Sequence, residues 1–341
     1  MIRTLLGSTI VVAGMWLAAS SAPTFSQDPP KPAPAPTPAP AEKPPQEPED
    51  KRLGLYDPIR ISGIPDADKE KLAKQYEVVT TWLSAELERK VEFVPVNDYA
   101  AAVTALASRK VDMVWLGGVT AVQAIEVTKN RCQPLFAREE DLKFKSYFIA
   151  NKKLVDEGKF TAVTERKSMP LESLAALKPK FAEYTFTFGA KTSTSGHIMP
   201  RYFMEKPEVG LDPEKSFKQK PGYALQGGHS TVLSNVGSGA FDLGVLNYIS
   251  WEQAKDEQKA QAPVIYVTPE YADYCMVGHG RLGPVLQIRI IKAFIMLDPA
   301  KERDKAVLDV FGAKKFVSLP SNFLDPITAI VKSAKQRGIL E

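Results

Sequence analysis

The sequence predicts an α/β fold arranged as two lobes. Strand and helix patterns alternate from about residue 55 onwards, which is typical of a mostly parallel sheet covered by helices. The alternation comes in two series, one starting near residue 58 and the other near residue 184. The 341 residues suffice for two separate cores, since a single core stops growing at about 250–300 residues. We therefore expect one α/β lobe for each series.

The first series contains three strand patterns and two helix patterns. In chain order they are strand 58–65, helix 68–90, strand 91–96, helix 100–110 and strand 111–118. The long helix is predicted by apolar residues at helical spacing, namely Leu72, Tyr76, Val79 and Leu83. The last strand is apolar and ends in two glycines, as expected of a buried strand followed by a tight turn.

The second series repeats part of this plan. It predicts a strand at 184–189, a helix that begins near His197, a helix at 230–239 and a strand at 241–247. Residues of its last helix and strand match those of the first series at a constant separation of 130 residues; the pairs are Leu106 with Val236, Ser108 with Ser238, Asp112 with Asp242, and Leu116 with Leu246. At this separation Tyr99 corresponds to His229, so both are expected at the starts of equivalent helices.

Two further segments connect the series. Residues 134–152 leave the first lobe and residues 264–280 return to it, which predicts a two-strand hinge of the kind that lets lobes close on a ligand. The expected organisation is lobe 1 at 55–148 and 270–341, and lobe 2 at 149–269. Helices near 285–297 and 327–338 are expected to pack on lobe 1.

The N-terminal region has the composition of an export signal. Arg3 precedes an uncharged apolar run at 5–19 and small residues at 18–22, which predicts a signal peptide at 1–26, cleaved near 20–27, and a location outside the cytoplasm. An uncleaved membrane anchor is the alternative. Residues 27–54 form a linker whose frequent prolines favour an extended spacer or a passive tail.

Composition narrows the classes of function. The net charge is +4 and charges of both signs alternate along the chain, which does not indicate a nucleic-acid-binding surface. His197, His229 and His279 stand apart, so no metal site or cofactor is predicted. Two cysteines, Cys132 and Cys275, are too few for a disulfide framework, and we expect them to be unpaired.

The segment 188–197, FGAKTSTSGH, carries the clearest chemical signal. It follows a strand, precedes a helix and holds four consecutive hydroxyl residues from Thr192 to Ser195. The first N–H groups of a helix lack internal acceptors and attract anions, and the hydroxyls of Ser193, Thr194 and Ser195 add donors. One hydroxyl would suffice for an ordinary helix cap. The excess favours an anion site.

Two enzyme motifs resemble this segment but are incomplete. A phosphate-binding P-loop requires Gly-x4-Gly-Lys-Ser/Thr, whereas Ala190 precedes the lysine here. A serine hydrolase would require Gly-x-Ser-x-Gly, which the segment does not provide. No nucleophile with an adjacent base is visible, so we do not expect an enzyme.

Other residues are candidates for the same site. His229 follows a glycine-rich loop and can donate to an oxyanion as an imidazolium, although a lone histidine is more often structural. Gly117, Gly118 and Thr120 follow a buried strand, where open α/β sheets bind ligands. Tyr99 opens a helix of the same lobe, with core packing as the alternative.

At these residues the chain resembles the phosphate/phosphite/phosphonate-type substrate-binding proteins of ABC transporters. The resemblance spans residues 58–299 and rests on NDYAAAV, VDMVWLGG, FGAKTSTSGHIMPRYF, GGHSTVL and YADYCMVGHGRLGPVLQIRIIKAFIMLD. WLGG and STSGHIMPRYF are most similar to the subgroup labelled selenate-binding proteins. The family resemblance implies a type II periplasmic-binding-protein fold with a ligand between the lobes. The family's Ser-Thr-Ser falls on Ser193, Thr194 and Ser195, its histidine on His229 and its tyrosine on Tyr99.

The resemblance also implies partners and a ligand class. We expect a monomer that binds a small tetrahedral oxyanion (phosphonate, phosphite, phosphate or a selenate-like ion) and presents it to a membrane permease. Members that bind aminoalkyl-phosphonates have acidic residues near the amine, whereas Asn247 follows the second-lobe strand here. Leu116-Gly117-Gly118 likewise departs from the family's aromatic-Gly-Pro. The alternative is a ligand sensor for a membrane histidine kinase.

Overall fold

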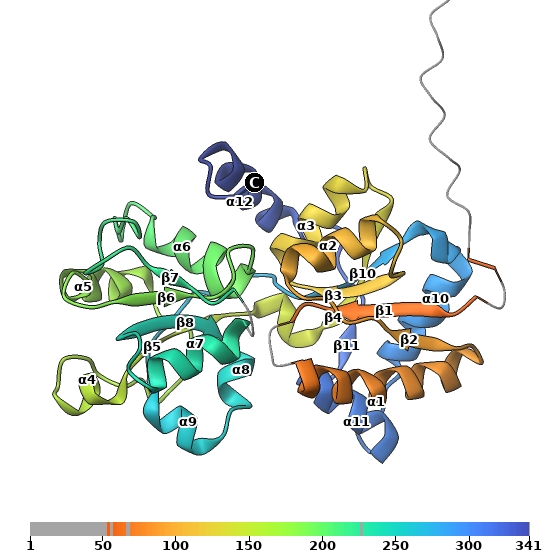
Figure 1. Cartoon of the computed structure of the whole chain (residues 1–341), viewed down its shortest axis with the longest axis horizontal. Coiled ribbons are helices and arrows are strands. Elements are labelled where there is room, and N and C mark those ends of the chain that lie inside the picture. Colours follow the sequence, from red (N-terminus) through yellow and green to blue (C-terminus); the bar gives the residue numbers. More distant parts are fainter. Residues whose placement is uncertain (1–52, 55–56, 66–68, 226–227, 341) are drawn as a thin grey trace, which may run out of the picture. The chain divides into compact units, whose positions relative to one another are not determined.

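The computed structural model describes residues 53–54, 57–65, 69–225 and 228–340. Its strands form two separate sheets, as the two series of patterns predicted (Figure 1). The expected signal peptide at 1–26 lies outside the described residues, as does the linker apart from Leu53 and Gly54. Of the helices in the described part, none combines the length and the hydropathy that a bilayer crossing requires.

The first sheet has six strands in the order β11-β4-β10-β3-β1-β2. Their bounds are β1 Ile59–Gly63, β2 Val91–Phe93, β3 Met113–Leu116, β4 Cys132–Arg138, β10 Cys275–His279 and β11 Phe316–Val317. Strands β1, β2 and β3 are parallel, whereas β10 runs antiparallel to both β3 and β4. The returning chain therefore inserts β10 into the middle of the first sheet.

The second sheet has five strands in the order β7-β6-β8-β5-β9. Their bounds are β5 Ser146–Ala150, β6 Phe186–Phe188, β7 Gly222–Tyr223, β8 Leu243–Asn247 and β9 Val264–Val267. Strand β5 pairs antiparallel with β8 and β9, so the second sheet begins at Ser146. The boundary expected at 148 therefore needs correction, because residues 146–148 already belong to this sheet.

Helices accompany each sheet. Those of the first series and the C-terminal part are α1 Lys69–Leu87, α2 Tyr99–Ala107, α3 Gly118–Val127, α10 Gly283–Ile295, α11 Glu302–Phe311 and α12 Asp325–Gln336. Those between the crossovers are α4 Lys152–Asp156, α5 Leu171–Phe181, α6 Met199–Met204, α7 Gly228–Gly237, α8 Tyr248–Glu252 and α9 Asp256–Gln261. Helix α10 packs on α1 and β4, and α12 packs on α3.

The two crossover segments lie side by side. One leads from β4 to β5 and the other from β9 to β10. Phe144 and Tyr271 join them through a pair of backbone hydrogen bonds, in which each N–H donates to the other's carbonyl at 2.7 and 2.9 Å. The connection between the sheets is therefore a short antiparallel ribbon.

The repeat seen in the sequence is also present in the structure. Helix α2 and strand β3 form one helix-strand unit, and α7 and β8 form the other. Asp112 lies just before β3 and its Oδ2 accepts the N–H of Arg60 at 2.8 Å. The corresponding Asp242 accepts the N–H of Thr185, also at 2.8 Å. In each unit the aspartate thus anchors its strand to the start of the neighbouring one.

Cys132 and Cys275 lie on paired strands of the first sheet. Cys132 is opposite His279, whereas Cys275 is opposite Leu116 at the other end of β10. The register therefore keeps the two buried thiols apart, although the chain brings their strands together.

Candidate anion-binding site

The hydroxyl segment forms the start of a helix in the second lobe. After β6, the N–H of Gly189 donates to the carbonyl of Gly196 at 2.8 Å, which closes the loop that carries the hydroxyls. A π-helical turn follows at Thr194–Ile198 and continues into α6; the N–H of Ile198 donates to the carbonyl of Ser193 at 3.0 Å. The helical turn therefore starts three residues before His197, the position expected from the sequence.

The three hydroxyls have three different roles. Ser193 Oγ accepts the N–H of Gly196 at 3.0 Å, the geometry of an ordinary helix cap. Thr194 Oγ1 accepts the N–H of Val119, in the first lobe, at 2.9 Å. Ser195 Oγ is buried and has no hydrogen-bond partner among the described residues. An unsatisfied buried hydroxyl is costly, and the pKa of Asp273 and that of Tyr271 both respond to the nearby Ser195 hydroxyl, so Ser195 is the donor of this segment that we assign to a ligand.

The glycines after β3 form the start of α3, where several distant groups meet. Gly117 caps the helix without a side chain. The N–H of Gly118 donates to Asp273 Oδ1 at 3.1 Å, while Thr194 takes the next N–H. A Cβ on Gly117 would lie 3.0 Å from Thr194 Oγ1 and 3.2 Å from Asp273 Oδ1. Glycine therefore allows this close approach, since a larger residue would displace Thr194 or Asp273. Thr120 is turned inward, since its hydroxyl donates to the carbonyl of Gly117 at 2.9 Å.

Asp273, on the returning crossover, was not among the residues that the sequence predicted. Its side chain is buried, and burial raises its pKa to about 7 although the N–H of Gly118 stabilises the carboxylate. Asp273 Oδ2 has no hydrogen-bond partner among the described residues. A carboxyl group that titrates near neutrality therefore completes the N-terminus of α3.

His229 is held at the start of α7 in one tautomer. Its Nδ1 accepts the N–H of Asn247 at 3.2 Å, so the ring proton is on Nε2. Nε2 then donates to the hydroxyl of Tyr274 at 3.2 Å. Burial lowers the pKa of His229 to about 3. In this environment His229 is a neutral imidazole that donates from Nε2.

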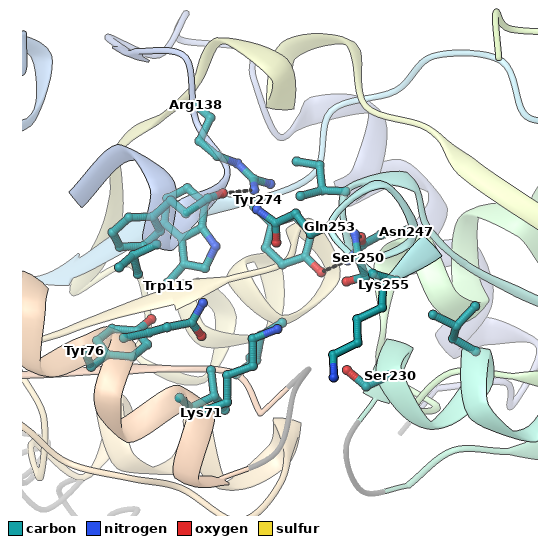
Figure 2. Close-up of a pocket in the computed structure, with 18 of the residues that line it drawn as sticks. Lys71, Tyr76, Trp115, Arg138, Ser230, Asn247, Ser250, Gln253, Lys255 and Tyr274 are labelled. Atoms are coloured by element: carbon teal, nitrogen blue, oxygen red, sulfur yellow. Dashed lines mark hydrogen bonds between the residues drawn. The ribbon is translucent and has the colours of Figure 1, made fainter. Parts of the chain in front are cut away.

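Asn247 ends β8 and bonds in two directions. Its Oδ1 accepts the N–H of Ser250 at 2.6 Å and so caps α8. Its Nδ2 donates to the hydroxyl of Tyr274 at 3.0 Å, as Figure 2 shows. Donors from His229 and Asn247 thus converge on one oxygen atom, the hydroxyl of Tyr274. An oxygen of an anion could accept both of these hydrogen bonds in the same way.

A cavity of about 400 Å³ adjoins these donors. Asn247, Ser230 and Tyr274 line it from one side, and Trp115 and Arg138 from the first lobe (Figure 2). The rings of Trp115 and Tyr274 are stacked, with centroids 6.0 Å apart.

The hydroxyl segment contacts His229 and is not among the described residues that line this cavity. A Cβ on Gly196 would be 3.0 Å from His229 Cε1, so the segment and the imidazole are in direct contact. Tyr99 is placed differently from the other candidates. It is a buried residue at the start of α2, which packs on α3, and it does not line the cavity.

The described residues contain no group of three or more His, Cys, Asp or Glu side chains arranged to hold a metal ion. The polar groups at the site are hydroxyls, amides, a neutral imidazole and a carboxyl. Such a set can bind and orient an oxyanion through hydrogen bonds.

Two α/β lobes, joined by paired crossovers and meeting at buried donors, define the class of bilobed periplasmic binding proteins. Solved structures of such binding proteins are similar to this chain. PhnD1 from Prochlorococcus marinus (MIT 9301), in complex with methylphosphonate, is similar with a TM-score of 0.72 and 30% identity, covering 83% of this chain and 99% of that one. A binding protein of an ABC phosphonate transporter from Pseudomonas aeruginosa shares the fold, with a TM-score of 0.66 and 22% identity over 83% of this chain and 87% of that one.

The family follows from the sequence. A model of the family described as ABC transporter, phosphonate, periplasmic substrate-binding protein matches residues 61–321, and the chain belongs to that family. It is therefore an extracytoplasmic binding component with a small ligand and a membrane permease as partners.

Two curated proteins are similar to the chain in sequence. The chain is 33% identical over 272 residues to a probable ABC transporter phosphite binding protein, PhnD1, of Prochlorococcus marinus (strain MIT 9301), covering 77% of this chain and 85% of the relative. It is 22% identical over 280 residues to the phosphonates-binding periplasmic protein of Escherichia coli (strain K12), covering 81% and 76%.

Proposed function

We propose that the chain binds phosphite or a small phosphonate in its cleft and delivers it to the permease of an ABC importer. The convergence of His229 Nε2 and Asn247 Nδ2 on the Tyr274 hydroxyl, at 3.2 and 3.0 Å, carries the proposal. An oxygen of the ligand would replace that hydroxyl as their acceptor. Ser195 Oγ would supply a third donor only to an oxygen seated beside His229, since the hydroxyl segment contacts that imidazole and is not among the described cavity-lining residues.

The donors are neutral, which suits a transport protein. Hydrogen bonds from neutral groups to an anion are charge-assisted, yet they leave no ion pair to break on release. The phosphite-binding name of the Prochlorococcus marinus relative and the methylphosphonate in its structure support this ligand class. The chain would act without breaking a bond, as a monomer, after export and cleavage near residues 20–27.

Isothermal titration calorimetry with phosphite, methylphosphonate, phosphate, sulfate and selenate tests the proposal. Hydrogen bonds to charged groups contribute about 1.5–3 kcal/mol. Ser195→Ala and His229→Gln should therefore each weaken phosphite or methylphosphonate binding by about ten- to a hundredfold.

Ser193→Ala is the matched control. Its hydroxyl caps the helix, so we expect a loss of about 1 kcal/mol in unfolding free energy with affinity nearly unchanged. Failure of the wild-type protein to bind any of the five anions, or unchanged affinity in both Ser195→Ala and His229→Gln, would refute the proposed site.

A further inference from the structure

The C-terminal helix α12 is fixed on the first lobe. Its buried side chains lie on one face of the helix and are Ile327, Val331 and Ala334. Ile327 packs against Gly118, the first residue of α3, where an added Cβ would lie 3.3 Å from the isoleucine side chain. Near the other end of α12, Lys335 forms an ion pair with Glu126 of α3 at 2.6 Å. Apolar packing and an ion pair therefore hold α12 on the first lobe.

The end of the same helix contacts the second lobe. Arg337, which directly follows α12, forms an ion pair through Nη2 with Glu205 Oε1 at 2.8 Å. Glu205 directly follows α6, the helix that continues from the hydroxyl segment. Half of the Arg337 side chain is exposed, whereas only 16% of the Glu205 side chain is exposed. Neither residue is among the described residues that line the ligand cavity. The ion pair therefore joins the two lobes outside the ligand site.

The second lobe holds the Glu205 carboxylate in place without help from α12. Arg201 Nε donates to the same Oε1 at 2.9 Å, and Arg201 Nη1 donates to Glu214 at 2.9 Å. One arginine and two glutamates leave this cluster with one negative charge in excess. Arg337 of the first lobe supplies the opposite charge. The attraction acts only at short range, because physiological salt screens exposed charges beyond about 8 Å.

The surface between α12 and the second lobe is loosely packed. A cavity of about 190 Å³ remains there, and its wall includes Tyr202 from the second lobe and Ile330 and Ile339 from the C-terminal part. Well-packed protein interiors contain few voids larger than a water molecule. Little close-packed surface therefore opposes separation of the lobes at this place, and the Arg337–Glu205 ion pair is a contact that separation would break.

We propose that α12 stabilises the arrangement in which the lobes are in contact, through the Arg337–Glu205 ion pair, and so raises the ligand affinity from outside the site. Thr194, just before α6, accepts the N–H of Val119 on α3, so an opening that moved α6 away from α3 would break both contacts. Loss of the ion pair would raise the population of the open form. A ligand that binds the closed form would then bind more weakly. The inference goes beyond the proposed function and uses its ligands as a probe of closure.

Arg337→Gln tests the contact between the lobes, and Lys335→Gln is its matched control. Each substitution removes one ion pair at the end of α12, but the Lys335 pair lies within the first lobe. In isothermal titration calorimetry of the purified protein, Arg337→Gln should weaken phosphite or methylphosphonate binding about two- to fivefold, as expected for a partly exposed ion pair. Lys335→Gln should leave the affinity unchanged. Sodium chloride at about 1 M should remove most of the difference between Arg337→Gln and wild type.

Small-angle X-ray scattering of the ligand-free protein gives a second, independent measurement. Arg337→Gln should have a larger radius of gyration than wild type, and Lys335→Gln should not. A role confined to the stability of α12 would lower the unfolding free energy without this change. Glu205→Gln removes the other partner of the ion pair. Adding Arg337→Gln to Glu205→Gln should weaken binding no further, because the interaction is already lost.

These measurements separate the inference from the proposed function. If wild type binds methylphosphonate and Arg337→Gln binds it equally tightly, the inference fails and the proposed function stands. The same holds if Lys335→Gln weakens binding as much as Arg337→Gln does. If wild type binds neither phosphite nor methylphosphonate, the proposed function fails and scattering alone decides the inference. Equal radii of gyration for wild type and Arg337→Gln would then overturn it.

Discussion

The helix that follows β3 and the helix that follows β8 occupy equivalent places in the repeat, yet their N-termini are completed differently. Gly117 begins the first without a side chain, and its N–H groups are taken by Asp273 and Thr194 from elsewhere in the chain. Asn247, at the equivalent position, caps its own helix and turns its amide nitrogen to Tyr274.

The difference shows how one structural unit acquires two functions. Helix α8 of the second lobe is capped by Asn247 of the same lobe. The amide nitrogen of Asn247 is therefore left to donate at the cavity. The helix of the first lobe obtains a cap from Thr194 of the second lobe. An opening that separated Thr194 from Val119 would remove this hydrogen bond, so the N-terminus of α3 is tied to the arrangement of the two lobes.

The largest effect is expected on the pH dependence of the unfolding free energy in Asp273→Asn. This substitution replaces the carboxyl group that caps α3 with an amide, the group that caps α8 in the second lobe. Burial raises the Asp273 pKa from 3.8 to about 7, so the folded state holds this proton more tightly. Its contribution to stability is complete below pH ~4, falls as the pH rises to about 7 and is constant above; the loss is at most on the order of 4 kcal/mol.

Urea unfolding of both proteins between pH 4 and 8 checks this. The stability of Asp273→Asn relative to wild type should increase from pH 4 to 7 and then level off. The low pKa of His229 has the opposite pH dependence, but it is present in both proteins and cancels in the difference. Parallel stability curves would show that Asp273 does not titrate in this window.

The paired aspartates of the repeat should differ in their effect on stability. Asp112 is fully buried and forms an ion pair with Arg281 at 3.0 Å, whereas Asp242 bonds to the backbone and hydroxyl of Thr185. Removing one partner of a buried pair costs about 3–5 kcal/mol, and losing hydrogen bonds to a carboxylate about 1.5–3 kcal/mol. Because Arg281 is partly exposed, we expect Asp112→Ala to lose about 3 kcal/mol and Asp242→Ala about half of that in chemical denaturation. Equal losses would contradict the comparison.

Gly117→Ala should weaken the coupling between the lobes. The added Cβ would lie 3.0 Å from Thr194 Oγ1, so the contact between the lobes would have to loosen. We expect ligand affinity to fall about tenfold, equivalent to the loss of one hydrogen bond of roughly 1.4 kcal/mol. Scattering in solution should show a more open form. Gly237→Ala, whose Cβ would make only an ordinary contact with Gln261 Cβ at 3.4 Å, controls for glycine replacement, with affinity expected to remain unchanged.

The smallest effect is expected from Asn247→Asp, which keeps the α8 cap and adds a carboxylate to the cavity wall. The ratio of affinities for 2-aminoethylphosphonate and methylphosphonate should rise about two- to fivefold, as expected for one partly exposed charge pair. Calorimetry measures both ligands. Asn247→Ser retains a helix-capping oxygen without the charge, and it should leave the ratio unchanged.

The sequence predicted the elements and the repeat well, because both depend on local patterns. The strand and helix of each unit lie where apolar periodicity placed them, and Asp112 and Asp242 make equivalent contacts. The family resemblance is confirmed by the family model and a curated relative.

The separate roles of the residues within the site could not be predicted. Ser193, Thr194 and Ser195 look alike in sequence, and only the fold makes one a cap, one a contact between the lobes and one an unpartnered donor. Asp273 and Tyr274 lie on a crossover without periodicity, so nothing local marks them. The charge state of His229 depends on burial and on the N–H of Asn247, which comes from a separate strand.

The ribbon formed by the crossovers limits how the lobes can move. Sliding one crossover along the other would break both hydrogen bonds between Phe144 and Tyr271, whereas bending the ribbon across its face keeps them. The ribbon therefore favours rotation of one lobe relative to the other over sliding between them. A permease that contacts both lobes would then detect ligand binding from the angle between them. The same angle would report any ligand that closes the lobes.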